Sequence, residues 1–224
     1  MERHFDEELK ELKKALLKMA TLSEAAIYKS IESLKNQDKK LAKDIINEDR
    51  NIDELELEIE EKSINLLALR QPMARDLRFI TTGMKINAEL ERIADLAVNI
   101  AQQVFELADK PQLKPLKDIP KLAAVARRMV KDVIDSFVNR DGNLAKRAIL
   151  LDPEADKLKN LICDELINGY IMKDCITAPQ AISLFLIARH LERICDHATN
   201  IAEDVIYMVQ SRVVKHHPEK LQDK

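Results

Sequence analysis

Glycine and aromatic residues are scarce in this chain of 224 residues, which has 3 glycines, no tryptophan and 4% aromatic residues. Sheet proteins usually need glycine in their turns and aromatic residues in their strands. The chain is instead rich in Ala, Leu, Lys and Glu, which are strong helix formers. The composition therefore favours an all-α fold.

Long apolar runs, a basic excess and paired cysteines are missing as well. No apolar run approaches the roughly 18 residues of a membrane span, and the N-terminal MERHFDEELK lacks a signal core, so we expect a cytoplasmic protein. The 36 basic and 39 acidic residues are mixed along the chain, which argues against a nucleic-acid-binding protein. Cys163, Cys175 and Cys195 form no CxxC, so we expect three small buried hydrophobic residues.

The sequence contains an internal repeat. Residues 31–65 align with 134–168 at an offset of 103, and 14 of the 35 pairs are identical. At an offset of 101, ERIADLAVNIA (91–101) matches ERICDHATNIA (192–202) at 8 of 11 positions. A repeat of about a hundred residues suits one small domain. We therefore predict two domains, 1–112 and 113–224, each a three-helix bundle.

Apolar spacing and turn residues predict six helices. They cover about 5–34, 39–69, 73–108, 121–139, 144–172 and a last stretch from after Pro179 to about Val214. Asp38 is expected to cap the second helix, and Pro153 fits the fifth only near a start or a kink. The proline-rich 110–115 is the expected linker, and the polar tail 216–224 is expected to fray.

Each half carries a row of polar side chains beside a heptad seam. Leu90, Ile93 and Ala97 begin a 3, 4, 3, 4, 3 spacing typical of helix packing, which the second copy repeats from Leu191 to Met208. Four-residue steps place further side chains in a line that points away from this seam. The two rows are Glu91, Asp95 and Asn99 in the first copy, and Glu192, Asp196 and Asn200 in the second.

Two more carboxylate pairs occur at matched positions, namely Asp49 with Asp53 and Asp152 with Asp156. A single such pair is typical of a solvated helix face, but four pairs in matched positions favour a shared role. Carboxylate and amide oxygens suit hard cations such as Mg, Ca, Mn or iron. We expect the pairs to complete each row from a neighbouring helix. His197 beside Asp196 is either a surface histidine or an additional nitrogen ligand.

Basic residues occur at two places near these motifs. Arg70, Arg75 and Arg78 surround the start of the third helix, where they form either a surface charge patch or a contact for an anion or a partner. Arg92 and Arg193 directly follow the row glutamates. They are expected to form local ion pairs or, beside a metal, to hold an anion.

The duplication and the segments RQPMARDLRFI (70–80), LERIADLAVNIA (90–101) and LERICDHATNIAE (191–203) resemble the PhoU family over essentially the whole chain. The resemblance implies two tandem three-helix bundles in a cytoplasmic negative regulator of the phosphate regulon. Such a regulator links the phosphate ABC transporter ATPase to a sensor histidine kinase, commonly as a homodimer that meets the membrane through its partners.

The resemblance also implies metal binding on the acidic motifs, with iron, Mg, Mn, Ca or Zn as candidate ions. One site would use Asp49, Asp53, Glu91, Asp95 and Asn99, and the other Asp152, Asp156, Glu192, Asp196 and Asn200. The segment around residues 72–78 has no clear second copy, so the two halves are not perfectly symmetric.

Two other functions remain open. The acids of a metal-free helical scaffold would only keep it soluble. An iron–carboxylate enzyme is disfavoured because no Glu is followed three residues later by His, and no phosphate-binding glycine loop occurs. We therefore expect a non-enzymatic adaptor.

Overall fold

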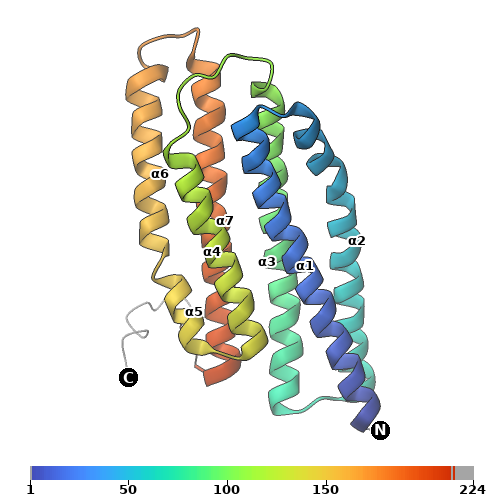
Figure 1. Ribbon diagram of the computed structural model, residues 1–224. Coiled ribbons are helices and arrows are strands. Elements are labelled where there is room, and N and C mark those ends of the chain that lie inside the picture. The colour runs from blue at the N-terminus through green and yellow to red at the C-terminus, as the bar shows by residue number, and fades with distance from the viewer. Residues whose placement is uncertain (1, 213, 215–224) are drawn as a thin grey trace.

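The structure, a computed structural model, describes residues 2–212 and 214 and consists of helices joined by short connections (Figure 1). The helices are α1 (Glu2–Asn36), α2 (Lys39–Arg70), α3 (Ala74–Leu107), α4 (Asp118–Asn139), α5 (Gly142–Ile149), α6 (Asp152–Leu166), the π-helical turn η1 (Ile167–Ile171) and α7 (Ala178–Gln210). No strand occurs among the described residues. The predicted all-α fold is confirmed.

The helices form two bundles that lie side by side (Figure 1). One contains α1, α2 and α3, and the other contains α4, α7 and the pair α5–α6. The bundles meet where α3 packs antiparallel to α7 and where α1 packs on α4. The connection between α3 and α4 spans residues 108–117, and the predicted domain boundary at 112 and 113 lies within it.

The two bundles begin their second helices with the same turn. Gln37 and Arg140 occupy equivalent positions and both adopt the left-handed conformation, with φ of 50° and 54°. The carboxylates of the next residues, Asp38 and Asp141, each accept a hydrogen bond from the backbone N–H three positions along. This cap satisfies an N–H that the helix itself leaves unpaired. The predicted capping role of Asp38 is thereby confirmed.

The predicted continuous helix 144–172 is wrong. The chain stops at Ile149 and restarts at Asp152, with Pro153 in the first turn of α6. Proline lacks the N–H that a continuing helix needs, and its ring clashes with the carbonyl four residues earlier. The equivalent position in the first bundle is Arg50, and α2 runs through it unbroken. Pro153 therefore lies near a helix start, one of its two predicted places.

The other helix limits differ by a few residues. α7 ends at Gln210, before the predicted Val214, because Ser211 takes a left-handed conformation with φ of 54°. The tail 216–224, for which fraying was predicted, lies outside the described residues.

The seam residues form the core, as the spacing predicted. Leu90, Ile93 and Ala97 are fully buried, and so are their counterparts in α7. Phe79 of α3 stacks on Phe137 of α4, with ring centroids 5.0 Å apart, so an aromatic pair also joins the two bundles. The rows on α3 and α7 are themselves held together by the direct packing of these two helices.

The cysteine prediction is correct for two of the three residues. Cys163 and Cys195 are buried, but Cys175 is exposed. Cys175 lies in the connection between η1 and α7, where no helix face directs it into the core.

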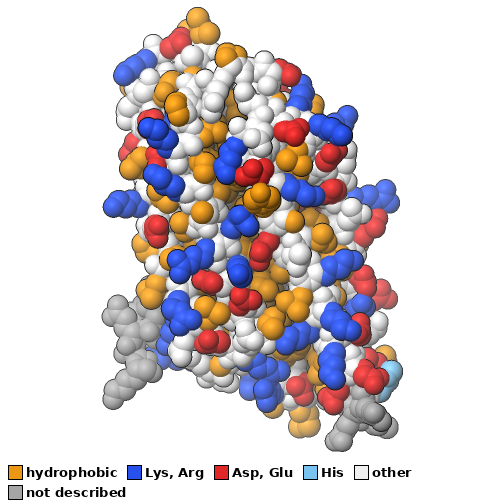
Figure 2. Space-filling view, viewed as in Figure 1, with side chains coloured by type: hydrophobic (Ala, Val, Ile, Leu, Met, Phe, Trp, Pro, Cys, Tyr) orange, Lys and Arg blue, Asp and Glu red, His pale blue; other side chains and the backbone are white. Residues whose placement is uncertain are grey.

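The surface in Figure 2 mixes Lys and Arg with Asp and Glu, and no broad area of one sign covers this face. In the part of the chain that the structure describes, every helix is too short or too polar for a membrane crossing.

Candidate metal-binding clusters

The packing of α2 against α3 brings the predicted acids of the first half together. We call Asp49, Asp53, Glu91, Asp95 and the additional Glu56 the first cluster. Steps of three and four residues keep each helix's members on one face, and the contact between the helices places the two faces beside each other. The carboxylates are close enough that the charges of Asp53, Glu56 and Asp95 raise the pKa of neighbouring members.

Crowding of negative charge shows in the pKa values of the first cluster. Burial, Asp53 and Asp95 raise the pKa of Asp49 to about 6. Burial, Asp95 and Glu56 raise the pKa of Glu91 to about 7. Burial and Asp53 also raise the pKa of Asp95. Ionised carboxylates held this close repel one another, so a cation or a proton stabilises the arrangement.

One oxygen of the first cluster is left without a partner. Oδ1 of Asp49 is buried and accepts no hydrogen bond. An unsatisfied buried acceptor is costly, and a cation is one group that would satisfy it. The donor set of the first cluster therefore fits a hard, oxygen-binding metal ion.

The second half forms an equivalent group on α6 and α7. We call Asp152, Asp156, Glu192 and Asp196 the second cluster. Burial, Glu192 and Asp152 raise the pKa of Asp196 to about 6. Burial and Asp156 likewise raise the pKa of Asp152. The same chemistry therefore occurs in both bundles.

A lysine distinguishes the second cluster from the first. Lys159 Nζ lies 3.4 Å from Glu192 Oε1 and 3.7 Å from Asp156 Oδ1. The equivalent position in the first bundle is Glu56, at the repeat offset of 103. This position supplies a carboxylate to the first cluster and an ammonium group to the second. The first cluster is therefore the more acidic of the two.

The carboxylates would have to rearrange to bind an ion. Within residues 2–212 and 214, no three Asp, Glu, His or Cys side chains are already placed to hold a metal. Mutual repulsion keeps ionised carboxylates apart until a cation offsets their charge. Asp53 and Asp95 are exposed, so their side chains are free to change rotamer.

The polar residues at the ends of the rows face other groups. Asn200 Nδ2 lies 3.3 Å from Glu89 Oε2, and His197 Nδ1 lies 2.6 Å from the same oxygen. Both side chains of α7 thus contact a carboxylate of α3, across the boundary between the bundles. Asn99 borders a hollow between the same two helices, together with Asp95.

The three arginines around the start of α3 have different surroundings. Arg70 forms a two-point ion pair with Glu8, with N–O distances of 2.8 and 2.7 Å. Arg75 lies close to Arg140, whose pKa is lowered by burial and by Arg75. Nε of Arg78 is buried and unpaired. Arg70 therefore joins α1 to the end of α2, and only Arg75 and Arg78 keep unpaired groups.

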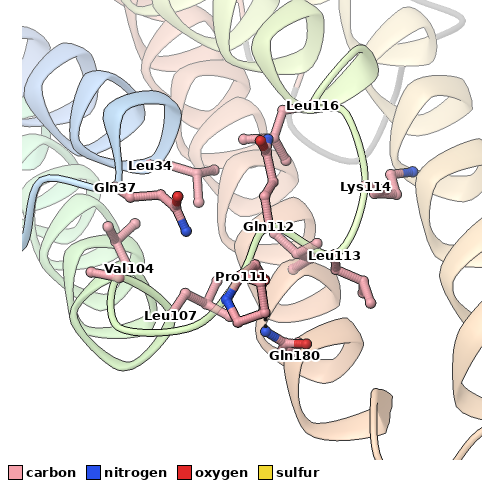
Figure 3. A pocket seen from close by; sticks show the side chains of 12 residues that line it. Leu34, Gln37, Val104, Leu107, Pro111, Gln112, Leu113, Lys114, Leu116 and Gln180 are labelled. Atoms are coloured by element: carbon pink, nitrogen blue, oxygen red, sulfur yellow. Dashed lines mark hydrogen bonds between the residues drawn. The ribbon is translucent and has the colours of Figure 1, made fainter.

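An apolar pocket at the far end of the bundles is too small for a metabolite. It lies between the ends of α1 and α3, the connection to α4 and the start of α7 (Figure 3), where Gln180 donates a hydrogen bond to the Pro111 carbonyl. Its volume is about 30 Å³, roughly that of one water molecule. It is a packing gap beside the linker.

The sequence rows missed one member of the first cluster. Glu56 lies three residues after Asp53 on α2, which is the spacing of helix neighbours. Its counterpart in the second half is Lys159, so Glu56 does not belong to a matched pair of acids. The helical spacing alone would have identified it.

A family model described as "PhoU domain" matches the chain twice, at residues 16–104 and 119–205. The chain is 41% identical over 209 residues to the "Phosphate-specific transport system accessory protein PhoU homolog" of Aquifex aeolicus, covering 93% of this chain and 94% of that protein. It is 34% identical over 221 residues to PhoU homolog 2 of Thermotoga maritima, covering 99% of this chain and 94% of that protein.

Solved structures give the same result. The crystal structure of PhoU from Pseudomonas aeruginosa matches with a TM-score of 0.89 and 32% identity, covering 93% of this chain and all of that one. The phosphate transport system regulatory protein PhoU from Streptococcus pneumoniae matches with a TM-score of 0.87 and 29% identity, covering 94% of this chain and 99% of that one.

Proposed function

The chain belongs to the PhoU family, and we propose that it is a non-enzymatic regulator of phosphate uptake and of the phosphate regulon. The observation that carries this proposal is the 41% identity, over 93% of the chain, to a protein named as an accessory of phosphate-specific transport. The relative is matched over nearly its whole length, so both repeats are shared.

In the proposed mechanism the protein is a cytoplasmic adaptor, active as a homodimer. Its long helix faces dock on the transporter ATPase and on the sensor histidine kinase, which connects uptake to transcription. The mixed charge of the face in Figure 2 suits contacts with proteins better than contacts with a nucleic acid.

Deletion of the gene tests the regulatory role. In phosphate-rich medium, the deletion strain should express a phosphate-regulon reporter, and the wild-type gene should restore repression. Affinity capture from the complemented strain should recover the transporter ATPase and the kinase. A reporter that stays repressed after deletion would contradict the regulatory role, and capture of neither partner would contradict the adaptor mechanism.

We further propose that the two clusters bind hard cations, with the first cluster as the stronger site. The support is the oxygen donor set, the unpaired Oδ1 of Asp49 and the raised pKa values of the acids. When bound, the ion supplies positive charge that holds the carboxylates of two helices together. The chain's part is to present Asp49, Asp53, Glu91 and Asp95 from rigid helices.

Metal analysis of the purified protein tests this second proposal. The doubly substituted protein Asp95→Asn/Asp196→Asn should retain less metal than wild type, and Asp44→Asn, which changes an exposed acid of α2 outside the cluster, should retain as much. Equal metal in all three would rule against these sites, and absence of metal from the wild-type protein would favour the metal-free scaffold. Turnover of a phosphate ester that appears only with added iron would instead favour an enzyme.

A further inference from the structure

A hollow lies between α3 and α7, where the two repeats meet. Its volume is about 250 Å³. Residues of both repeats line it: Arg92, Asp95, Leu96, Asn99, Arg193 and His197. Arg92 and Arg193 are equivalent in the repeat, at an offset of 101. The antiparallel contact of the two helices therefore brings both guanidinium groups to one hollow.

The charge of Arg92 helps to lower the pKa of Glu89, but neither arginine forms a hydrogen bond or ion pair within the described part of the chain. Two nearby carboxylates have other partners, since Glu89 contacts His197 and Glu192 contacts Lys159. The local ion pairs expected from the sequence are absent at these two positions. Ten N–H donors, five on each guanidinium, are left for another acceptor.

Charge and size indicate the class of acceptor. The lining holds two guanidinium groups and one carboxylate, that of Asp95, and a second carboxylate, that of Glu89, contacts the lining residue His197. Arginine donors form a planar fork that matches the oxygens of phosphate. A hollow of about 250 Å³ is smaller than the roughly 300–1,000 Å³ of sites for drug-sized ligands. A small tetrahedral oxyanion fits it better than a nucleotide.

We propose that Arg92 and Arg193 bind inorganic phosphate in this hollow, with the Asn99 amide as an additional donor. The ligand contacts both repeats at once, so binding tightens the contact between α3 and α7. Inorganic phosphate would then be a ligand of the proposed regulator, and this biological role rests on the proposed function. Binding itself is measured on the isolated protein, so its failure is distinct from failure of the regulatory role.

Calorimetric titration of the metal-stripped full-length protein with inorganic phosphate tests the proposal. We expect saturable binding that weakens by about tenfold or more in Arg92→Gln and in Arg193→Gln, because each loses charge-assisted hydrogen bonds. Arg189→Gln removes an arginine of α7 that lies outside the hollow, and this control should bind like wild type. Helicity measured by circular dichroism confirms that each variant is folded.

Competition distinguishes the source of the oxyanion. Sulfate should compete with phosphate, whereas acetate should not, and phosphoserine should bind more weakly because its amino-acid part exceeds the hollow. Three results would overturn the proposal: no saturable binding at millimolar phosphate, equal binding by wild type and both variants, or tighter binding of phosphoserine than of phosphate. The last would assign the arginines to a phosphorylated partner.

Discussion

Lys159 of α6 lies 3.4 Å from the carboxylate of Glu192 on α7, so the second cluster contains a cation of its own. The two side chains are only 20% and 18% exposed, and solvent screens their attraction less than it would on an open surface. The first cluster has Glu56 in the equivalent position. The duplicated motifs therefore differ in charge at their centre.

This difference predicts unequal cation affinity. Lys159→Glu should strengthen binding at the second cluster, and Glu56→Lys should weaken it at the first. Each change should be about tenfold or more, because a unit charge at about 4 Å is worth up to ~4 kcal/mol at an effective dielectric of 20. Titration with Mn²⁺, followed by its electron paramagnetic resonance signal, measures both. Identical affinities in wild type and Lys159→Glu would contradict the assigned role of Lys159.

The first cluster should make the metal-free protein less stable as pH rises. The pKa of Glu91 is about 7 in the folded state and 4.5 in its ordinary state, so the folded chain holds more protons between these values. The contribution of Glu91 to the free energy of unfolding is therefore fully present below about pH 4.5 and is lost as the pH rises toward 7. Solvent exposure reduces the size of the effect.

Thermal unfolding with chelator present, at pH 5 and pH 7.5, measures this change against the Glu91→Gln variant. The variant lacks the titrating group, so its melting temperature should fall less over the same interval. A steeper fall in the variant than in wild type would show that the sign is wrong.

Cation binding should have the opposite pH dependence. A metal ligand must lose its proton, and the pKa values of Asp49 and Glu91 are raised to about 6 and about 7. Affinity at the first cluster should therefore rise between pH 5 and pH 7.5 and then level off. Titrations across this range measure it. A constant affinity would mean that neither carboxylate is a ligand.

Asp95→Asn should separate stability from metal binding. It removes a charge that repels Asp53 and Glu91, so the metal-free protein should gain on the order of 0.5–1 kcal/mol, at a few tenths per like-charged pair. The same change should weaken cation binding. Urea unfolding measures the first effect and metal titration the second, with Asp44→Asn as control. Loss of stability in the metal-free variant would contradict this account of the crowded charges.

The aromatic pair between the bundles should contribute strongly to stability. Phe137 is 2% exposed and stacks on Phe79. Phe137→Ala should cost about 3–5 kcal/mol, as is usual for a buried aromatic residue. Phe137→Leu should cost less because it keeps apolar contact. Urea unfolding measures both, with exposed Tyr28→Ala as control. A loss no larger than that of the control would show that this contact is dispensable.

The fold was predictable because apolar residues at helical spacing mark the buried face of each helix. The 3, 4, 3, 4 steps from Leu90 placed the seam correctly, since only one face of a helix can meet its neighbours. Pro153 was harder to interpret, because a proline in a helical stretch permits a kink or a new start. Only the packing around α5 and α6 decides between them.

The sequence predicted the members that the two clusters share, but it did not predict the positions at which the two clusters differ. Asp49, Asp53, Glu91 and Asp95 stood out because their counterparts are also oxygen donors. Glu56 and Lys159 did not stand out, because these equivalent positions carry different residues and so form no matched pair. The orientation of His197 and Asn200 toward Glu89 depends on how α3 and α7 cross, which no local pattern specifies.

Joining the repeats in one polypeptide changes how their contact can evolve. The connection of residues 108–117 keeps α3 and α7 at a high effective concentration, so their association needs no symmetry and does not depend on how much protein the cell makes. A symmetric pair of separate subunits would have to accept every substitution twice. The tethered halves can accept different substitutions at matched positions, as they have at Glu56 and Lys159.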